Sequence, residues 1–197
     1  MEVSFRNGRK EDCTVLAELV SIASEGIIEF LFHDLISGVT PVQMVAHNLE
    51  SDKYPRTYKN TIVAESDEKI VGMALSIPSH FHKITEEMKE FFPEERLEHL
   101  KHFFSARVDN SLLLDTLCVD EKFRGKGIGA QLISLTKKKA KEADFGILSL
   151  MVLADNTDAQ RLYRRCGFEV AENVDLKSHE LIPHESGCIL MKCEIEP

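Results

Sequence analysis

The segment from Phe123 to Leu132 reads FRGKGIGAQL and places three glycines within five residues, directly after the apolar run LLLDTLCV at residues 112–119. Glycine costs roughly 0.5–1 kcal/mol relative to alanine inside regular structure, so this cluster indicates a backbone that must approach something closely. A strand followed by a glycine-rich turn and a helix directs unpaired backbone N–H groups, and the positive end of the helix dipole, at one point. The segment therefore predicts a site for a pyrophosphate group.

Two well-known phosphate loops differ from this segment. A Walker A loop is excluded, because no Gly-Lys-Ser/Thr sequence ends the segment. Gly125, Gly127 and Ala130 satisfy the dinucleotide pattern G-x-G-x-x-A, but that motif normally opens its domain. Here the motif lies in the last half of the chain, so the dinucleotide interpretation is disfavoured.

The loop resembles the pyrophosphate loop of the GNAT superfamily of N-acetyltransferases. Residues 124–129, RGKGIG, match its pattern R/Q-x-x-G-x-G/A, and residues 117–120 are similar to the strand end that precedes it. A second block, NTDAQRLYRRCGF at residues 156–168, is similar to the family pattern N-x-x-A-x-x-L-Y-x-x-x-G-F. The resemblance covers residues 112–170; the N-terminal half agrees in its order of elements.

The resemblance implies an α/β fold of the GNAT (acyl-CoA N-acyltransferase) type, with a mixed, mostly antiparallel sheet and helices on both faces. It also implies acetyl transfer from acetyl-CoA, used as a cosubstrate, to a primary amine of a small molecule or peptide, by direct attack in a ternary complex. The alternative is a non-catalytic domain that binds acyl-CoA as a sensor or regulatory module. The expected partners are therefore acetyl-CoA and an amine, and a homodimer stays open.

By the same resemblance, backbone N–H groups of the loop bind the pyrophosphate, with charge from Arg124 and Lys126 nearby. The end of the preceding strand separates from residues 148–153, so that the pantetheine arm pairs with its backbone and one N–H polarises the thioester carbonyl. Asn156 contacts the cofactor through its amide, and Tyr163 protonates the departing thiolate. The expected cofactor-binding residues are Leu117, Cys118, Val119, Arg124, Gly125, Lys126, Gly127, Ile128, Gly129, Asn156 and Tyr163.

The amine requires a base. An amine with a lysine-like pKa near 10.4 is almost wholly protonated at pH 7, so a nearby group must accept its proton. Asp115 is the first candidate, because it alternates with Leu117 and Val119 on a strand face that lines the substrate site in some relatives. His80 and His82, just past the third predicted strand, are the other candidates.

Several of these residues also have a purely structural interpretation. Tyr163 is then a core aromatic side chain, and Asn156 a helix cap. Cys118 is better explained as a small buried hydrophobe than as a nucleophile. The histidines between residues 80 and 102 lack a carboxylate or cysteine at a recognised spacing, so we expect no metal site.

Composition narrows the class of protein. With 197 residues, 43% of them hydrophobic, the chain is long enough for one domain with a sizeable core. The net charge of −9 argues against a nucleic-acid partner and suits an amine substrate. Five cysteines without a C-x-x-C pair disfavour a disulfide scaffold or a zinc ribbon. Because no signal-type apolar core and no apolar run of about 20 residues is present, we expect a cytoplasmic protein without a membrane partner.

Periodicity predicts the elements that position these residues. Strands are predicted over residues 3–6, 61–65, 70–77, 147–154, 168–174 and 188–195, with one more from residue 112, and helices over 27–37, 42–49, 128–143 and 159–165, with one more opening at residues 9–12. A helical insertion at about 78–111 is expected to form two amphipathic helices separated by Pro93. We expect residues 1–197 to form a single GNAT domain in which Phe91, Phe92, Phe103 and Phe104 form part of a substrate wall or lid.

Overall fold

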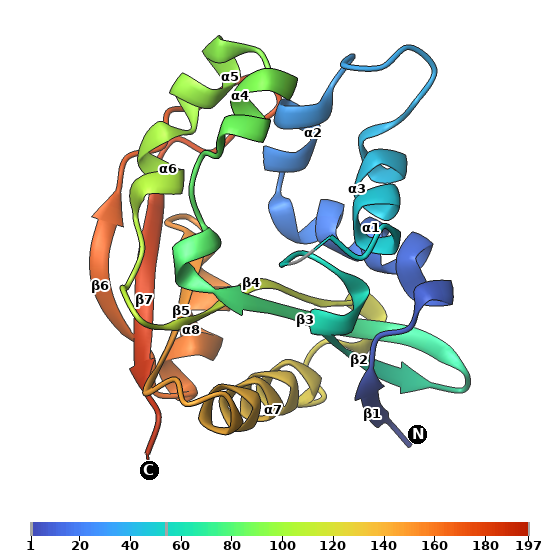
Figure 1. The fold of residues 1–197 in the computed structure, drawn as a ribbon. Coiled ribbons are helices and arrows are strands. Elements are labelled where there is room, and N and C mark those ends of the chain that lie inside the picture. The colour runs from blue at the N-terminus through green and yellow to red at the C-terminus, as the bar shows by residue number, and fades with distance from the viewer. Residues whose placement is uncertain (1, 54, 197) are drawn as a thin grey trace.

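The fold is built on one seven-stranded sheet with helices on both faces (Figure 1). The computed structural model describes residues 2–53 and 55–196. The strand order is β1-β2-β3-β4-β5-β7-β6, and every neighbouring pair is antiparallel except β4 and β5, which are parallel. The mixed, mostly antiparallel α/β architecture expected from the sequence is therefore confirmed.

The strands agree with the predicted ranges to within one residue at each end. They are β1 (Ser4–Asn7), β2 (Thr61–Ser66), β3 (Lys69–Pro78), β4 (Leu112–Val119), β5 (Ile147–Leu153), β6 (Glu169–Val174) and β7 (Cys188–Glu194). The helices are α1 (Cys13–Ser24), α2 (Ile27–Phe32), α3 (Pro41–Glu50), α4 (Glu86–Phe91), α5 (Glu94–His99), α6 (Lys101–Ser105), α7 (Ile128–Glu142) and α8 (Thr157–Arg165). Across the described residues, we find no helix with the length and apolar character needed to cross a bilayer.

The sheet separates two hydrophobic clusters. Because successive side chains of a strand point to opposite faces, Met73 and Leu75 of β3 face one cluster and Ala74 faces the other. The first cluster packs α1, α2 and α3 on the sheet, and the second packs α7, through Leu132 and Ile133. Helices therefore cover both faces (Figure 1), and the central strands are buried on both sides.

The predicted helix over residues 27–37 is shorter in the structure. The helix α2 ends at Phe32, because His33 leaves the helical conformation and Asp34 follows with a φ of 53°. Arg96 of α5 then donates to the carbonyl oxygens of Leu31 and His33, at 2.9 and 2.8 Å. An arginine from the insertion thus satisfies carbonyls at the end of α2, where a helix lacks internal donors.

The insertion contains three short helices, α4, α5 and α6, so the prediction of two was wrong. The predicted second helix is interrupted at Leu100, which ends α5 and precedes α6 with φ of −94° and ψ of 9°. Leu100 is fully buried in the first cluster. The helix breaks at this buried side chain, and a periodic apolar pattern in the sequence does not reveal such a break.

We predict that a Cβ at position 26, in the turn between α1 and α2, destabilises the protein. Gly26 has a φ of 102°, and a Cβ there would overlap the carbonyl oxygen of Leu181. Gly38 also has a positive φ, of 76°, but a Cβ there meets nothing within 4 Å. Gly38→Ala should lower the free energy of unfolding by ~1–2 kcal/mol, the cost of a left-handed alanine. Gly26→Ala should lower it by roughly a further 1–3 kcal/mol because of overpacking. Urea denaturation of both variants checks this, and equal losses would contradict the close contact.

Candidate active site

The site begins where β4 and β5 part. Their parallel pairing covers only Leu112 to Leu114 opposite Leu148 to Leu150. Beyond that point β4 stays paired with β3 as far as Val119, and β5 stays paired with β7 as far as Leu153. The edge of β4 that faces β5 consequently has no strand partner over residues 115–119 in the described chain. This is the separation that the resemblance implied.

A cavity of about 1610 Å³ occupies this opening. It is lined from both hydrophobic clusters, for example by Phe32 of the first and Tyr163 of the second, so it passes between the two strands from one face to the other. Typical small-molecule pockets measure about 300–1,000 Å³. The cavity is therefore large enough for a cofactor and a second ligand.

Asp115 lies at a β-bulge on the wall of the cavity. Ser76 pairs with Leu114 and Leu75 pairs with Thr116, so Asp115 is the extra residue on β4. A bulge redirects side chains and breaks strict alternation. The alternation of Asp115 with Leu117 and Val119, assumed from the sequence, is therefore interrupted.

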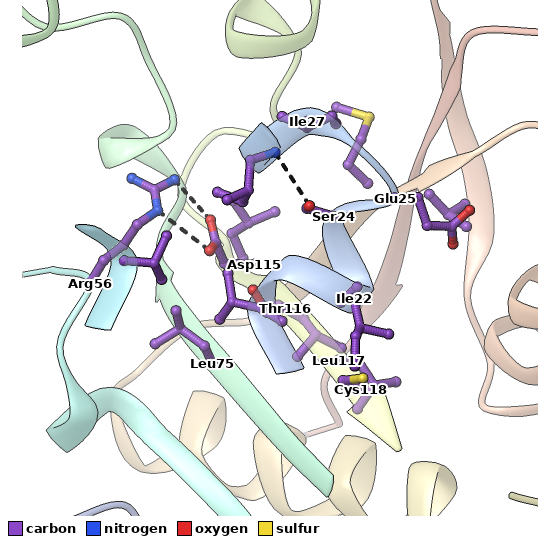
Figure 2. Close-up of a pocket in the computed structure, with 18 of the residues that line it drawn as sticks. Ile22, Ser24, Glu25, Ile27, Arg56, Leu75, Asp115, Thr116, Leu117 and Cys118 are labelled. Carbon is purple, nitrogen blue, oxygen red and sulfur yellow. Dashed lines mark hydrogen bonds and ion pairs between the residues drawn. The ribbon is translucent and has the colours of Figure 1, made fainter. Parts of the chain in front are cut away.

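The Asp115 carboxylate is held by Arg56, which sequence reasoning missed (Figure 2). Arg56 Nη2 donates to Oδ1 at 2.8 Å, and its Nε donates to Oδ2 at 3.4 Å. Arg56 lies between α3 and β2, 59 positions from Asp115, and no spacing pattern links the two residues. Protonation of this carboxylate removes its negative charge and so weakens the charge-assisted ion pair with Arg56.

His82 is a buried, neutral acceptor at the same cavity. Its Nε2 lies 2.9 Å from the carbonyl oxygen of Phe103, and because a carbonyl only accepts, Nε2 carries the proton. Nδ1 is buried and has no hydrogen-bond partner within the part of the chain that the structure describes. Burial lowers the pKa of His82, although the charge of Asp115 acts in the opposite direction. His80, in contrast, is exposed and lies beside Phe81.

The glycine-rich loop forms an open, positively polarised turn. Gly125 and Gly127 have φ of 75° and 81°, and a Cβ at either position would meet nothing within 4 Å. Gly127 is the N-cap of α7 and has no side chain with which to cap this helix end. Backbone N–H groups of the first turn, including those of Ile128 and Gly129, are therefore oriented as an anion-binding site.

Three other loop residues fix its position. Arg124 donates through Nε to the carbonyl oxygen of Val119 at 3.1 Å, which ties the loop to the end of β4. The ammonium of Lys126 lies over the ring of Phe123, 4.9 Å from its centroid. Gly129 has a packing role, because a Cβ there would lie 3.1 Å from Leu162 Cδ2 of α8. Helices α7 and α8 thus approach closely beside the loop.

The second sequence block places Asn156 and Tyr163 beside this cavity. Asn156 caps α8 by accepting the Ala159 N–H at 3.1 Å, as the structural interpretation expected, and its amide also donates to Glu25 Oε1 at 2.5 Å. Tyr163 is 8% exposed and packs edge-on against Phe168, with ring centroids 5.9 Å apart. Burial raises the pKa of Tyr163 and the charge of Glu25 raises it further, so its hydroxyl is protonated at neutral pH.

Comparison with known proteins identifies the family. Residues 32–168, more than half of the chain, match the Acetyltransferase (GNAT) family. The chain belongs to the GNAT acetyltransferase family. No curated protein sequence matches it.

Solved structures share the fold over nearly the whole chain. An acetyltransferase crystal structure is 26% identical with a TM-score of 0.65, covering 98% of this chain and 100% of that one. An N-acetyltransferase from Staphylococcus aureus Mu50 is 19% identical with a TM-score of 0.68, covering 95% and 99%. The yncA putative acetyltransferase from Salmonella typhimurium, determined with its cofactor acetyl-CoA, is 15% identical with a TM-score of 0.61, covering 100% and 96%.

This GNAT domain also carries a polar cluster that sequence reasoning missed. Glu25, in a left-handed conformation at the end of α1, bonds to Asn156 and lies 3.6 Å from Nε2 of His184. His184 Nδ1 lies 2.8 Å from Asp155 Oδ2. The cluster joins the α1–α2 turn to the loop before β7. Its one sequence signal is the Glu-Gly pair at residues 25–26, which marks a helix end.

The remaining side chains of interest are the Cys118 thiol and the possible metal ligands. Cys118 is 5% exposed, and burial raises the pKa of its thiol to about 11, which favours the structural interpretation. Over the ranges 2–53 and 55–196, no three His, Cys, Asp or Glu side chains are grouped so as to hold a metal ion. His99 instead bonds to the carbonyl oxygen of Lys177.

We predict that Gly127→Val abolishes acetyl-CoA binding in a folded protein, because the new side chain enters the open space above the loop. Isothermal titration calorimetry measures the affinity. The matched control is Gly38→Val, which imposes a comparable positive-φ strain in an open loop and should keep wild-type affinity. Unchanged affinity in the Gly127 variant would contradict the pyrophosphate assignment.

Proposed function

We propose that this chain transfers the acetyl group of acetyl-CoA to a primary amine. The observation that carries this proposal is the parting of β4 and β5, together with a glycine-capped N-terminus of α7 that Arg124 ties to the end of β4. The unpaired backbone groups at the edge of β4 can form hydrogen bonds with an extended thioester arm. Backbone N–H groups at the start of α7 can bind the pyrophosphate at the far end of that arm. Membership of the GNAT family and the acetyl-CoA in the Salmonella structure support the same cosubstrate.

The cosubstrate is assigned to the residues that the two sequence blocks share with the family. Residues 124–129 bind the pyrophosphate, and the backbone of residues 117–119 binds the pantetheine arm. One N–H of that strand end polarises the thioester carbonyl and stabilises the oxyanion. Asn156 acts through Glu25 and the start of α8 and so fixes the wall near the thioester.

The reaction needs one proton donor and one proton acceptor. The amine nitrogen attacks the thioester carbon, the C–N bond forms, and the C–S bond breaks with its electron pair on sulfur. Tyr163 donates its hydroxyl proton to this thiolate, which the raised pKa of the buried phenol keeps available at neutral pH. Asp115 accepts the proton of the amine, directly or through water, and His82 is the alternative acceptor.

A non-catalytic acyl-CoA-binding module is the second candidate. The observation that favours it is the ion pair between Arg56 and Asp115, which occupies both carboxylate oxygens. The two functions differ in one measurable property. A transferase consumes acetyl-CoA only when an amine is added, whereas a sensor binds acetyl-CoA and leaves it intact across an amine and peptide panel.

The insertion belongs to the substrate side of the site. Phe91, Phe92, Phe103 and Phe104 all line the cavity, which supports their proposed role as a substrate wall. Phe104 is also part of the first hydrophobic cluster, and His82 bonds to the Phe103 carbonyl. These contacts support treating residues 1–197 as one domain with an insertion.

Tyr163→Phe tests the proton donor. The variant keeps the ring and its contact with Phe168, so acetyl-CoA affinity and thermal stability should change little. Turnover should fall by about 10², the usual contribution of general acid catalysis. Steady-state kinetics measures the turnover of this variant, and calorimetry measures its acetyl-CoA affinity. Wild-type turnover in this variant would refute the donor role.

The pH profile of kcat/KM separates the two candidate bases. A base must be unprotonated, so activity falls on the acidic side as pH drops through its pKa. If Asp115 is the base, Asp115→Asn should remove or shift that limb and leave the basic limb in place. If His82 is the base, His82→Gln should do so instead, and the wild-type limb should lie below pH ~6.5, because burial lowers the pKa of His82. An unchanged limb in either variant excludes that residue as the base.

A further inference from the structure

Most of the exposed large apolar side chains line the active-site cavity. In the described chain, the large hydrophobic residues with the most exposure are Val15, Ile22, Ile36, Val39, Phe91 and Val170, at 36–56%. Four of these six, namely Ile22, Ile36, Val39 and Phe91, line the cavity. They come from the end of α1, the loop between α2 and α3, and the end of α4. We call these four residues the apolar rim.

Aromatic side chains line part of the cavity wall next to Phe91. Phe91 contacts Phe92 edge-on, with ring centroids 5.0 Å apart, and Phe92 contacts Phe32 in the same way at 5.1 Å. Met88 and Phe103 line the cavity beside them. A ligand that contacts these side chains thus meets rings and aliphatic groups.

The cavity wall also carries polar groups. The ion pair of Asp115 with Arg56 projects from β4 (Figure 2), and the unpartnered Nδ1 of His82 is buried near it. A ligand that fits both regions has an apolar body and a single polar end that can donate a hydrogen bond or carry a positive charge. A second ammonium or a run of hydroxyls placed against these rings would leave water without gaining a hydrogen-bond partner.

We propose that the acceptor is a primary amine carried, within a few bonds, on an aromatic or branched aliphatic body. This inference rests on the proposed acetyl transfer and names the substrate class of the same site. The body covers the apolar rim and removes it from water, and the amine reaches the acidic and basic groups near β4. The shared chemistry is the apolar amine, either as a free molecule or as the first residue of a peptide.

The test compares amines that differ only in their bodies. Phenethylamine and ethanolamine present the same primary amine on a two-carbon chain, one ending in a phenyl ring and the other in a hydroxyl. Burial of a phenyl group should favour phenethylamine by roughly 10- to 100-fold in kcat/KM. Equal efficiencies, or a preference for ethanolamine, would overturn the proposal. A short peptide beginning with phenylalanine, as a third substrate, distinguishes a peptide source from a free amine.

Rim variants connect this preference to the surface. Phe91→Ser and Ile36→Ser should each raise the KM for phenethylamine by about 5- to 10-fold, and should leave the KM values for ethanolamine and acetyl-CoA unchanged. Val170→Ser is the matched control, because Val170 is 45% exposed on β6, away from the cavity. If the control variant has the same effect as the rim variants, or if the rim variants have none, the rim does not bind the acceptor.

Two further measurements distinguish an acceptor site from a non-catalytic ligand site and from a subunit interface. Calorimetric titration of the CoA-bound protein with both amines measures the preference without turnover. A preference for phenethylamine there, with no acetylation of any amine, refutes the transferase and retains the ligand class. Light scattering reports the oligomeric state of each variant. A rim variant that dissociates an oligomer without changing the phenethylamine KM assigns the rim to a subunit interface and overturns the proposal.

Discussion

The site depends on one constraint: β4 and β5 pair for three residues and then separate. Backbone N–H and C=O groups that leave a sheet must find other partners, and within this sheet the free edge of β4 offers them to a ligand. The separation persists because each strand has another neighbour, β3 for β4 and β7 for β5. The sheet therefore stays continuous at one end and opens at the other, without a break in either strand.

The surrounding elements hold this opening in register with the phosphate loop. Arg124 bonds to the last carbonyl of β4, so the loop begins at a fixed distance from the strand edge. Close contact between Gly129 and Leu162 brings α7 and α8 together at the ends of the two strands. The side chain of Asn156 then links α8 to Glu25 at the end of α1. The part of the site that we propose binds the cofactor is thus held together by short contacts among α1, β4, α7 and α8.

The part of the cavity proposed to bind the acceptor is assembled differently. Its polar groups come from distant segments: Arg56 follows α3, His82 follows β3, and Asp115 lies at a bulge in β4. Its apolar wall comes from α2 and the insertion, held together by the bonds from Arg96 to the end of α2. A proposed cofactor-binding part of the GNAT type can therefore be combined with a proposed acceptor-binding part whose chemistry is set by loops and an inserted segment.

Sequence alone determined the local features of this protein. Strand ranges follow from a two-residue period of side chains. The glycine-rich loop follows from glycines that stand close together in the sequence, because Gly125 and Gly127 adopt a positive φ and leave the space above them open. The tertiary structure decided features that depend on residues far apart: the bulge at Asp115, its ion pair with Arg56, the early end of α2 and the helix break at Leu100. Each of these is fixed by packing or hydrogen bonding between segments tens of residues apart, and no periodic pattern within one segment encodes such a contact.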